Sequence, residues 1–164
     1  GSTFYFGLEL TTSNEAAESV ILQGTNVDTI KDELIKTNHS VKKITVLIVE
    51  DNRINMLLLK TIIKNLPIKT TVFEVVNGKQ AVEQFETINP DIIFMDIQMP
   101  IMNGYEATKL IRNIKTGQNV PIIAITAGTE KEEKEKCIKS GMDDYIPKPI
   151  IKGIIEETFI KWIK

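Results

Sequence analysis

Five short apolar runs are separated by longer segments of mixed polarity between residues 44 and 164. The runs are ITVLIVE at 44–50, TTVFEVV at 70–76, DIIFMD at 91–96, VPIIAIT at 120–126 and DDYIP at 143–147. Short apolar runs bounded by turn residues are typical of β-strands. The intervening and final segments have the amphipathic spacing of helices and comprise residues 52–66, 78–88, 103–115, 130–140 and 150–164. Strands that alternate with helices predict a doubly wound α/β domain, with a five-stranded parallel sheet covered on both faces.

The residues before this region have a different pattern. From Thr3 to Leu10, apolar and polar residues alternate with a period of two, which is typical of a half-buried strand. Residues 13–43 have no aromatic side chain and are rich in Ser, Thr, Asn, Glu and Lys, so we expect a polar linker there. We therefore divide the chain into an orphan strand at 1–12, a linker at 13–43 and a folded domain at 44–164.

The composition narrows the classes of function. The chain has 164 residues, of which 42% are hydrophobic and 26% charged, and its formal net charge of −2 does not favour nucleic acid or a membrane surface as the main partner. The only cysteine, Cys137, excludes an intrachain disulfide, and the only histidine, His39, lies in the polar linker. A histidine metal cluster and a Ser-His triad are therefore excluded. No apolar run approaches the ~20 residues that span a bilayer, so we expect a cytoplasmic protein.

Chemically reactive side chains stand at or just after the ends of four predicted strands. Glu50 and Asp51 follow the first strand, Asp96 ends the third, Thr126 ends the fourth, and Lys148 follows the fifth. Because the carboxyl ends of parallel strands meet at one edge of a sheet, we expect these groups to converge there. Each residue also has an ordinary interpretation. Asp51 or the residue after it can cap a helix, and Asp96 can form a turn.

A cluster of carboxylates requires a partner, because like charges in one cleft repel unless a cation neutralises them. Oxygen ligands select a hard ion such as Mg²⁺ or Mn²⁺, which keeps open positions for water and for a phosphoryl oxygen. Lys148 would pair with a carboxylate and then with the phosphoryl group, and Thr126 would donate a hydrogen bond to a phosphoryl oxygen. The combination predicts a site that places phosphate on a carboxylate.

The chain closely resembles the receiver, or response-regulator, domains of two-component signalling, particularly those of hybrid histidine kinases. The resemblance rests on four motifs in order, VLIVEDNRIN, DIIFMDIQMPIMNGYEAT, PIIAITA and GMDDYIPKPI. It covers residues 44–164 and implies a flavodoxin-like (βα)5 fold with the strand order 2-1-3-4-5. It implies that Asp96 is the phospho-acceptor of a Mg²⁺-dependent phosphorelay. Asp51 would bind the metal directly, Glu50 would act on it through water, and the backbone carbonyl of Gln98 would complete the ligands.

The resemblance also implies the contacts of the phosphoryl group and a switch. Thr126 and Lys148 would contact the phosphoryl group, and Tyr145 would change rotamer with phosphorylation. The peptide bond between Lys148 and Pro149 would be cis. The helix at 130–140 is nearly all charged, so we expect it to be weakly held and to shift in the switch. Its main apolar anchors would be Cys137 and Ile138.

One position departs from the family's pattern. Gly128 stands two residues beyond Thr126, where the family often has a larger side chain. With Gln98 it would flank the water that hydrolyses the acyl phosphate, so both positions bear on the lifetime of the phosphate. The alternative, which we favour as its main role, is that Gly128 relaxes the loop before the next helix.

The opening GSTFYFGLEL resembles the tail of a histidine-kinase ATPase domain. Together with the receiver motifs, it implies that the parent chain is a hybrid sensor histidine kinase of bacterial type. This fragment would itself be no enzyme, apart from promoting its own phosphorylation and dephosphorylation. The expected partners are the kinase core, a histidine phosphotransfer protein, or both, without nucleic acid or direct membrane contact.

Other functions fit the residues less well. A phosphatase with an aspartyl-phosphate intermediate would want a second Asp two residues after Asp96, where Gln98 stands. A flavin module would want a phosphate loop rich in glycine and hydroxyls after the first strand, whereas EDNRIN is acidic. A phosphate-independent interaction module would not need the full set of strand-end groups.

Overall fold

Strands and helices alternate along the chain in the computed structural model, which describes residues 43–128 and 131–163. The predicted orphan strand at 1–12 and linker at 13–43 lie outside the described residues, apart from Lys43. The elements, which include the short 3-10 helix η1, are β1 (Ile44–Val49), α3 (Arg53–Lys64), β2 (Thr70–Val75), α4 (Gly78–Ile88), β3 (Ile92–Asp96), α5 (Gly104–Asn113), η1 (Lys115–Gln118), β4 (Ile122–Thr126), α6 (Lys131–Lys139), β5 (Asp144–Pro147) and α7 (Lys152–Trp162).

The five strands form one parallel sheet in the order β2-β1-β3-β4-β5, so the predicted topology is confirmed. The register pairs Val49 with Met95 at the carboxyl ends of β1 and β3. It also pairs Thr126 with Pro147 at the ends of β4 and β5. The residues that end or follow these strands therefore lie along a single edge of the sheet.

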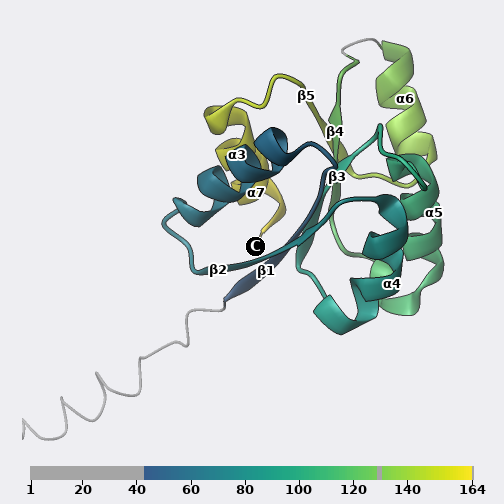
Figure 1. Cartoon of the computed structure of the whole chain (residues 1–164), viewed down its shortest axis with the longest axis horizontal. Helices are drawn as coiled ribbons and strands as arrows, with labels where there is room; N and C mark the ends of the chain where they lie inside the picture. Colours follow the sequence, from purple (N-terminus) through teal and green to yellow (C-terminus); the bar gives the residue numbers. More distant parts are fainter. Residues whose placement is uncertain (1–42, 129–130, 164) are drawn as a thin grey trace, which may run out of the picture. The chain divides into compact units, whose positions relative to one another are not determined.

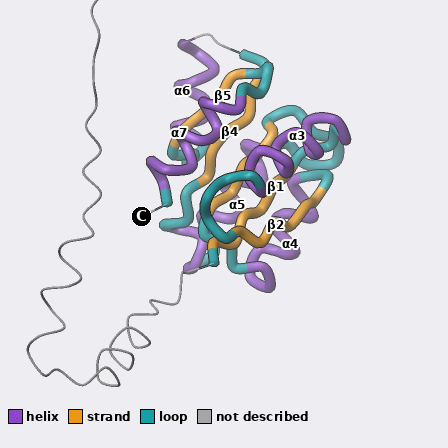
Figure 2. Tube along the Cα trace, turned by 90° about the vertical axis from the view of Figure 1, so that its left-hand side faces the viewer, coloured by secondary structure: helices purple, strands orange, loops and turns teal. Residues whose placement is uncertain are grey.

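Helices cover the sheet on both faces (Figures 1 and 2). Helices α3 and α7 pack on one face, and α4, α5 and α6 pack on the other. Strand β3 shows why the central runs are apolar throughout, because Phe94 enters the core under α3 and α7 while Ile93 and Met95 enter the opposite core. Successive side chains of a strand point to opposite faces, and here both faces are buried.

Helix α3 begins at the end of β1, beside the predicted site. The side-chain oxygen of Asn52 accepts hydrogen bonds from the backbone N–H groups of Ile54 and Asn55 and caps the helix. Asn52 is therefore the cap, and the alternative interpretation of Asp51 as the cap is wrong. The carboxylate of Asp51 is exposed at the sheet edge instead.

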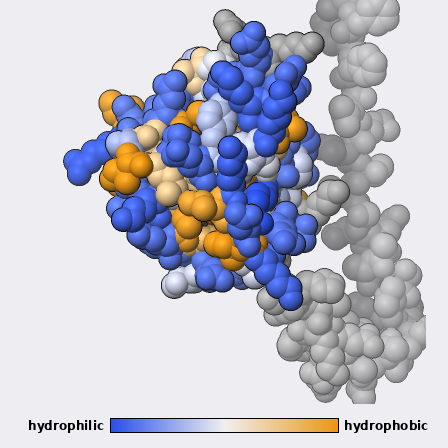
Figure 3. All heavy atoms as spheres, turned by 90° about the vertical axis from the view of Figure 1, so that its right-hand side faces the viewer, coloured by the Kyte–Doolittle hydropathy of each residue, from blue (hydrophilic) through white to orange (hydrophobic). Residues whose placement is uncertain are grey.

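Helix α6 agrees only in part with its sequence-based description. Cys137 is fully buried and belongs to the core that α4, α5 and α6 share, as expected. Ile138 is 50% exposed, so its prediction as an anchor is wrong. Adjacent residues of a helix are about 100° apart around its axis. Because Cys137 faces the sheet, Ile138 points away from it. The outer surface on this side of the molecule is largely hydrophilic, with smaller hydrophobic patches (Figure 3).

Helix α7 is tied to β5 by one carboxylate. Oδ2 of Asp144 accepts hydrogen bonds from Lys161 Nζ at 2.7 Å and from the indole N–H of Trp162 at 3.0 Å.

None of the helices in the described ranges combines the length and apolar composition that a bilayer crossing requires.

Candidate functional site

The carboxyl edge of the sheet brings three predicted carboxylates together. Glu50, Asp51 and Asp96 each place a carboxylate oxygen within 4.8 Å of the others. Glu50 and Asp96 are buried, with 1% and 2% of their surfaces exposed, whereas Asp51 is exposed. The buried pair lies side by side because β1 and β3 are neighbours in the sheet. The arrangement concentrates negative charge where water is largely excluded.

Lys148 reaches into this cluster from the segment after β5. Its Nζ atom lies 2.9 Å from Oδ2 of Asp96 and 3.2 Å from Oε2 of Glu50. Burial alone would lower the pKa of Lys148, but the hydrogen bond and charge of Asp96, and then the charge of Glu50, raise it above its ordinary value. The ammonium therefore stays charged at neutral pH. The peptide bond from Lys148 to Pro149 is cis, as the resemblance implied.

The residues around Glu50 do not fully neutralise its buried carboxylate. Burial, followed by the charge of Asp96, raises the pKa of Glu50 above its ordinary value. Its Oε1 atom accepts from the side-chain amide of Asn55 at 3.2 Å. Its buried Oε2 atom accepts no hydrogen bond from the described residues, although Lys148 is close enough for an ion pair. A cation at the cluster would satisfy this oxygen, so the residues present fit a hard metal ion.

Gln98 lies in the bend that follows β3. Its backbone N–H donates to Oδ1 of Asp96 at 3.3 Å, and its side chain is exposed. A cavity of about 480 Å³ opens beside it and is lined by Asp51, Ile97, Gln98, Met99, Pro100, Asn103, Tyr105, Glu133 and Lys136. Of the three carboxylates, Asp51 therefore faces an open cavity, whereas Glu50 and Asp96 do not line it.

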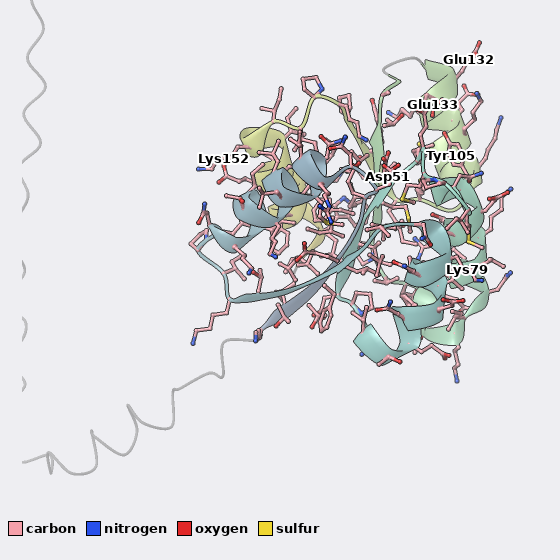
Figure 4. The ribbon with its side chains drawn as sticks, viewed as in Figure 1. Asp51, Lys79, Tyr105, Glu132, Glu133 and Lys152 are labelled. Carbon is pink, nitrogen blue, oxygen red and sulfur yellow. The ribbon has the colours of Figure 1, made fainter. Side chains whose placement is uncertain are left out.

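Thr126 makes its contacts toward α6. Its Oγ1 atom accepts from the backbone N–H of Gly128 at 3.1 Å and donates to Oε1 of Glu133 at 3.4 Å. The same Glu133 oxygen accepts a 2.5 Å hydrogen bond from the phenol of Tyr105 on α5. Figure 4 labels Tyr105 and Glu133 on these two helices, together with Asp51. Sequence reasoning missed Tyr105 and Glu133, since neither stands at a strand end.

Tyr145 is half-buried on β5, and the ammonium of Lys134 on α6 lies 5.3 Å from the centre of its ring. This places the predicted switch residue against the helix that we expected to move. A lysine at this distance from a phenol ring makes a favourable cation–π contact. The contact gives α6 a second tie to the strands, in addition to Glu133.

Gly104 is a further residue that sequence reasoning missed. A Cβ atom at this position would overlap the carbonyl oxygen of Asp96. The backbone N–H of Gly104 donates to the carbonyl of Ile97 at 3.0 Å, which holds the start of α5 against the end of β3. Only glycine allows this approach, so Gly104 sets the position of the loop that carries Gln98. Its signal in the sequence was the Asn-Gly pair that follows Met-Pro.

Comparison with known proteins adds to this geometry. Residues 46–159 match the family model of the response regulator receiver domain. The chain belongs to this family. It is therefore a response regulator receiver domain, and the resemblance of residues 44–164 to receiver domains is confirmed together with the fold that it implied.

Similar proteins show the setting in which such receiver domains occur. Hybrid signal transduction histidine kinase I of Dictyostelium discoideum is 43% identical over 120 residues, which are 69% of this chain and 7% of that protein. The chain thus spans a small part of the relative that it matches.

Solved structures that share the fold at more than 30% identity include two receiver domains of known setting. The receiver domain of the sensor histidine kinase PA1611 from Pseudomonas aeruginosa is 35% identical with a TM-score of 0.68, and the match covers 74% of this chain and 98% of that one. That structure has a magnesium ion coordinated in its active-site cleft. The receiver domain of Ssk1 from Saccharomyces cerevisiae, solved with the histidine phosphotransfer protein Ypd1, is 33% identical with a TM-score of 0.66. The latter match covers 73% of this chain and 88% of that one.

Proposed function

We propose that Asp96 accepts a phosphoryl group from a phosphohistidine in a Mg²⁺-dependent phosphorelay. The observation that carries this proposal is the buried pair of carboxylates with one ammonium against it. Glu50 and Asp96 are almost fully buried, and Lys148 lies within 3.2 Å of both. Such a cluster is costly to bury without function, because the repulsion and the loss of hydration of the two carboxylates oppose folding.

The proposed metal is Mg²⁺, with Mn²⁺ as the alternative. Asp51 and Asp96 would bind it directly, Glu50 would act through water, and the backbone carbonyl of Gln98 would be the remaining protein ligand. The magnesium site of the similar PA1611 receiver domain supports this proposal. When bound, the ion would supply the positive charge that neutralises the cluster and would polarise a phosphoryl oxygen.

The chain's own residues carry the remaining steps. A carboxylate oxygen of Asp96 forms the new P–O bond while the P–N bond to the donor imidazole breaks, and the imidazole keeps the electron pair of that bond. Lys148, now 2.9 Å from Oδ2 of Asp96, transfers its contact to a phosphoryl oxygen. Thr126 donates its hydroxyl to another phosphoryl oxygen. Positioning and charge stabilisation are the main requirements of phosphoryl transfer.

Thr126 would also start the switch. Its movement toward the phosphoryl group leaves space for Tyr145 to change rotamer, and α6 adjusts because it contacts both residues. Hydrolysis of the acyl phosphate would depend on Gln98 and Gly128, which flank the attacking water. Identical amide chemical shifts along residues 131–152 with and without beryllofluoride would contradict this switch.

Exposed apolar side chains around the site support a protein partner. Ile54 is 77% exposed after β1, Ile101 is 78% exposed after β3, and Ile151 is 53% exposed after β5. All three follow strands whose carboxyl ends lie at the sheet edge that holds the acidic cluster, and exposed apolar side chains there would suit a helix that presents a phosphohistidine. The complex of Ypd1 with the similar Ssk1 receiver domain makes a histidine phosphotransfer protein the proposed donor or acceptor. The kinase core of the parent protein is the other proposed donor.

The wider setting is also part of the proposal. The domain would occupy residues 44–164 of this chain, with the linker at 13–43 joining it to the kinase part that ends at 1–12. The parent would be a hybrid sensor histidine kinase in the cytoplasm or anchored to a membrane. This fragment would have no separate enzymatic activity.

Mg²⁺-dependent labelling tests the assignment of Asp96. Wild type incubated with acetyl phosphate or a phosphorylated phosphotransfer protein should become labelled only when Mg²⁺ is present. Asp96→Asn should not be labelled, because the amide cannot form the acyl phosphate. Glu86→Gln, which changes an exposed acid on α4, should behave as wild type. Labelling of Asp96→Asn at the wild-type level would contradict the proposal.

A further inference from the structure

The side chain of Glu133 links three elements beside the phosphorylation site. It extends from α6, and its Oε1 atom accepts hydrogen bonds from Tyr105 on α5 at 2.5 Å and from Thr126 at the end of β4 at 3.4 Å. Its Oε2 atom lies 3.9 Å from the ammonium of Lys136, and the side chain is 23% exposed. Glu132, the preceding residue, is exposed and makes no comparable contact with the described part of the chain; Figure 4 labels both residues.

The hydroxyl of Thr126 cannot donate a hydrogen bond to Glu133 and to a phosphoryl group at the same time. A hydroxyl has a single proton to donate. In this structure Thr126 directs that proton to Glu133 and uses its oxygen to accept from Gly128. Contact with a phosphoryl oxygen on Asp96 therefore requires that the bond to Glu133 be broken. Glu133 is also negatively charged and lines the same cavity as Asp51, so it opposes a dianionic group there.

Two neighbours hold Glu133 in this competing position. The phenol of Tyr105 stays protonated, because burial and then its hydrogen bond to Glu133 raise its pKa well above the ordinary value. A neutral phenol keeps its proton for Glu133. Gly128 supplies the space, since a Cβ atom there would lie 2.8 Å from Cγ of Glu133. The small residue that departs from the family's usual pattern thus coincides with the room that Glu133 needs.

We propose that Glu133 is a positioning residue that keeps Thr126 turned away from the phosphorylation site until a phosphoryl group competes for its hydroxyl. Tyr105 anchors Glu133, and Gly128 makes room for it. The consequence is a weaker hold on the phosphoryl group and a more stable unphosphorylated state. This inference rests on the proposed function, because it requires that Thr126 contact the phosphoryl group.

Beryllofluoride binding in the presence of Mg²⁺ measures the competition. Glu133→Ala should bind beryllofluoride about two- to tenfold more tightly than wild type, which is the range of one net hydrogen bond. Glu133→Gln keeps an acceptor oxygen and should fall between the two. Glu132→Ala, which removes the same charge from the neighbouring position, should leave the affinity unchanged. Equal affinities of wild type and Glu133→Ala would overturn the inference.

The Thr126→Ala background separates the hydrogen bond from simple charge repulsion. Without the hydroxyl there is no proton to compete for, so Glu133→Ala should change the affinity of Thr126→Ala much less than that of wild type. An equal change in both backgrounds would overturn the positioning role. Tyr105→Phe should tighten binding in the same direction as Glu133→Ala and should add nothing when the two are combined. Full additivity of the two changes would contradict the anchoring role of Tyr105.

A measurement on the metal-free protein needs no bound ligand. The methyl resonance of Thr126 reports its rotamer and should shift in Glu133→Ala and in Gly128→Ala, but not in Glu132→Ala. An unchanged Thr126 methyl resonance in folded Glu133→Ala would overturn the inference. Failure of wild type to bind beryllofluoride would instead count against the proposed function, so the two failures are distinguishable.

Discussion

Removal of the ammonium at the acidic cluster should destabilise the metal-free protein. Lys148 lies 2.9 Å from Asp96 and 3.2 Å from Glu50, which at an effective dielectric constant of about 20 corresponds to roughly 6 and roughly 5 kcal/mol of attraction. The side chain of Lys148 is only 24% exposed, so loss of its hydration offsets several kcal/mol of this sum. Breaking a buried ion pair typically costs about 3–5 kcal/mol. We expect Lys148→Met to lower the free energy of unfolding by about 3 kcal/mol.

The assay is urea denaturation at neutral pH, followed by the fluorescence of the single tryptophan, Trp162, and by circular dichroism. It is carried out in EDTA and again in excess MgCl₂. Mg²⁺ at about one hundred times its dissociation constant adds about 2.7 kcal/mol to the stability of a protein that binds it only when folded. Lys148→Met should gain more from Mg²⁺ than wild type does, because the ion then neutralises carboxylates that no ammonium balances.

The matched control is Lys152→Met, which removes an exposed lysine four residues further along the chain (Figure 4). Lys152 is 66% exposed and lies 3.6 Å from Glu156 in an i,i+4 pair. Such a pair contributes at most about 0.5 kcal/mol, so the control should remain close to wild type. Equal stabilities of Lys148→Met and Lys152→Met in EDTA would refute the reasoning. Equal gains of wild type and Lys148→Met from Mg²⁺ would refute it as well.

Three further predictions concern the scaffold. Burial alone would raise the pKa of Asp144, but hydrogen bonds led by that from Lys161 outweigh it, so the pKa lies below the ordinary 3.8. The stabilisation by the ionised carboxylate is therefore complete well above pH 3.8 and is lost as the pH falls through the folded-state pKa. Asp144→Asn should lower the free energy of unfolding by about 1 kcal/mol at neutral pH and by progressively less in acid. Urea midpoints measured across this pH range test the prediction. Gly104→Ala should cost about 1–3 kcal/mol and weaken Mg²⁺ binding in a titration, because its methyl group overlaps the carbonyl oxygen of Asp96. Gly153→Ala, which meets nothing within 4 Å in α7, should instead stabilise by about 0.5 kcal/mol.

Much of the fold was readable from the pattern of the chain. The central run at 91–96 is apolar without interruption, and the structure places it between two cores. Because parallel strands all end at the same edge, the pattern also predicted that Glu50, Asp96 and Lys148 would meet. The structure brings these three side chains together within ion-pair distance. Their roles in metal binding and phosphoryl transfer stay predictions.

The charged helix α6 was harder to describe from its sequence. KEEKEKCIK has no apolar stripe that defines which side faces the sheet, so Cys137 and Ile138 were equally good anchors. Tertiary packing buries the first and exposes the second. The rotation that buries Cys137 also turns Glu133 toward Thr126, which no periodicity in the sequence indicated.

The sequence by itself determined which segments become strands and helices, and which reactive groups stand at the strand ends. This information is local, because it depends on the spacing of apolar residues and on the chemistry of single positions. Only the tertiary structure decided that Asn52 caps α3, that Gly104 lies against the carbonyl of Asp96, and that Tyr105 and Glu133 share a hydrogen bond beside Thr126. These features depend on helix rotation, rotamers and distances of closest approach, which arise when residues far apart in the chain pack together.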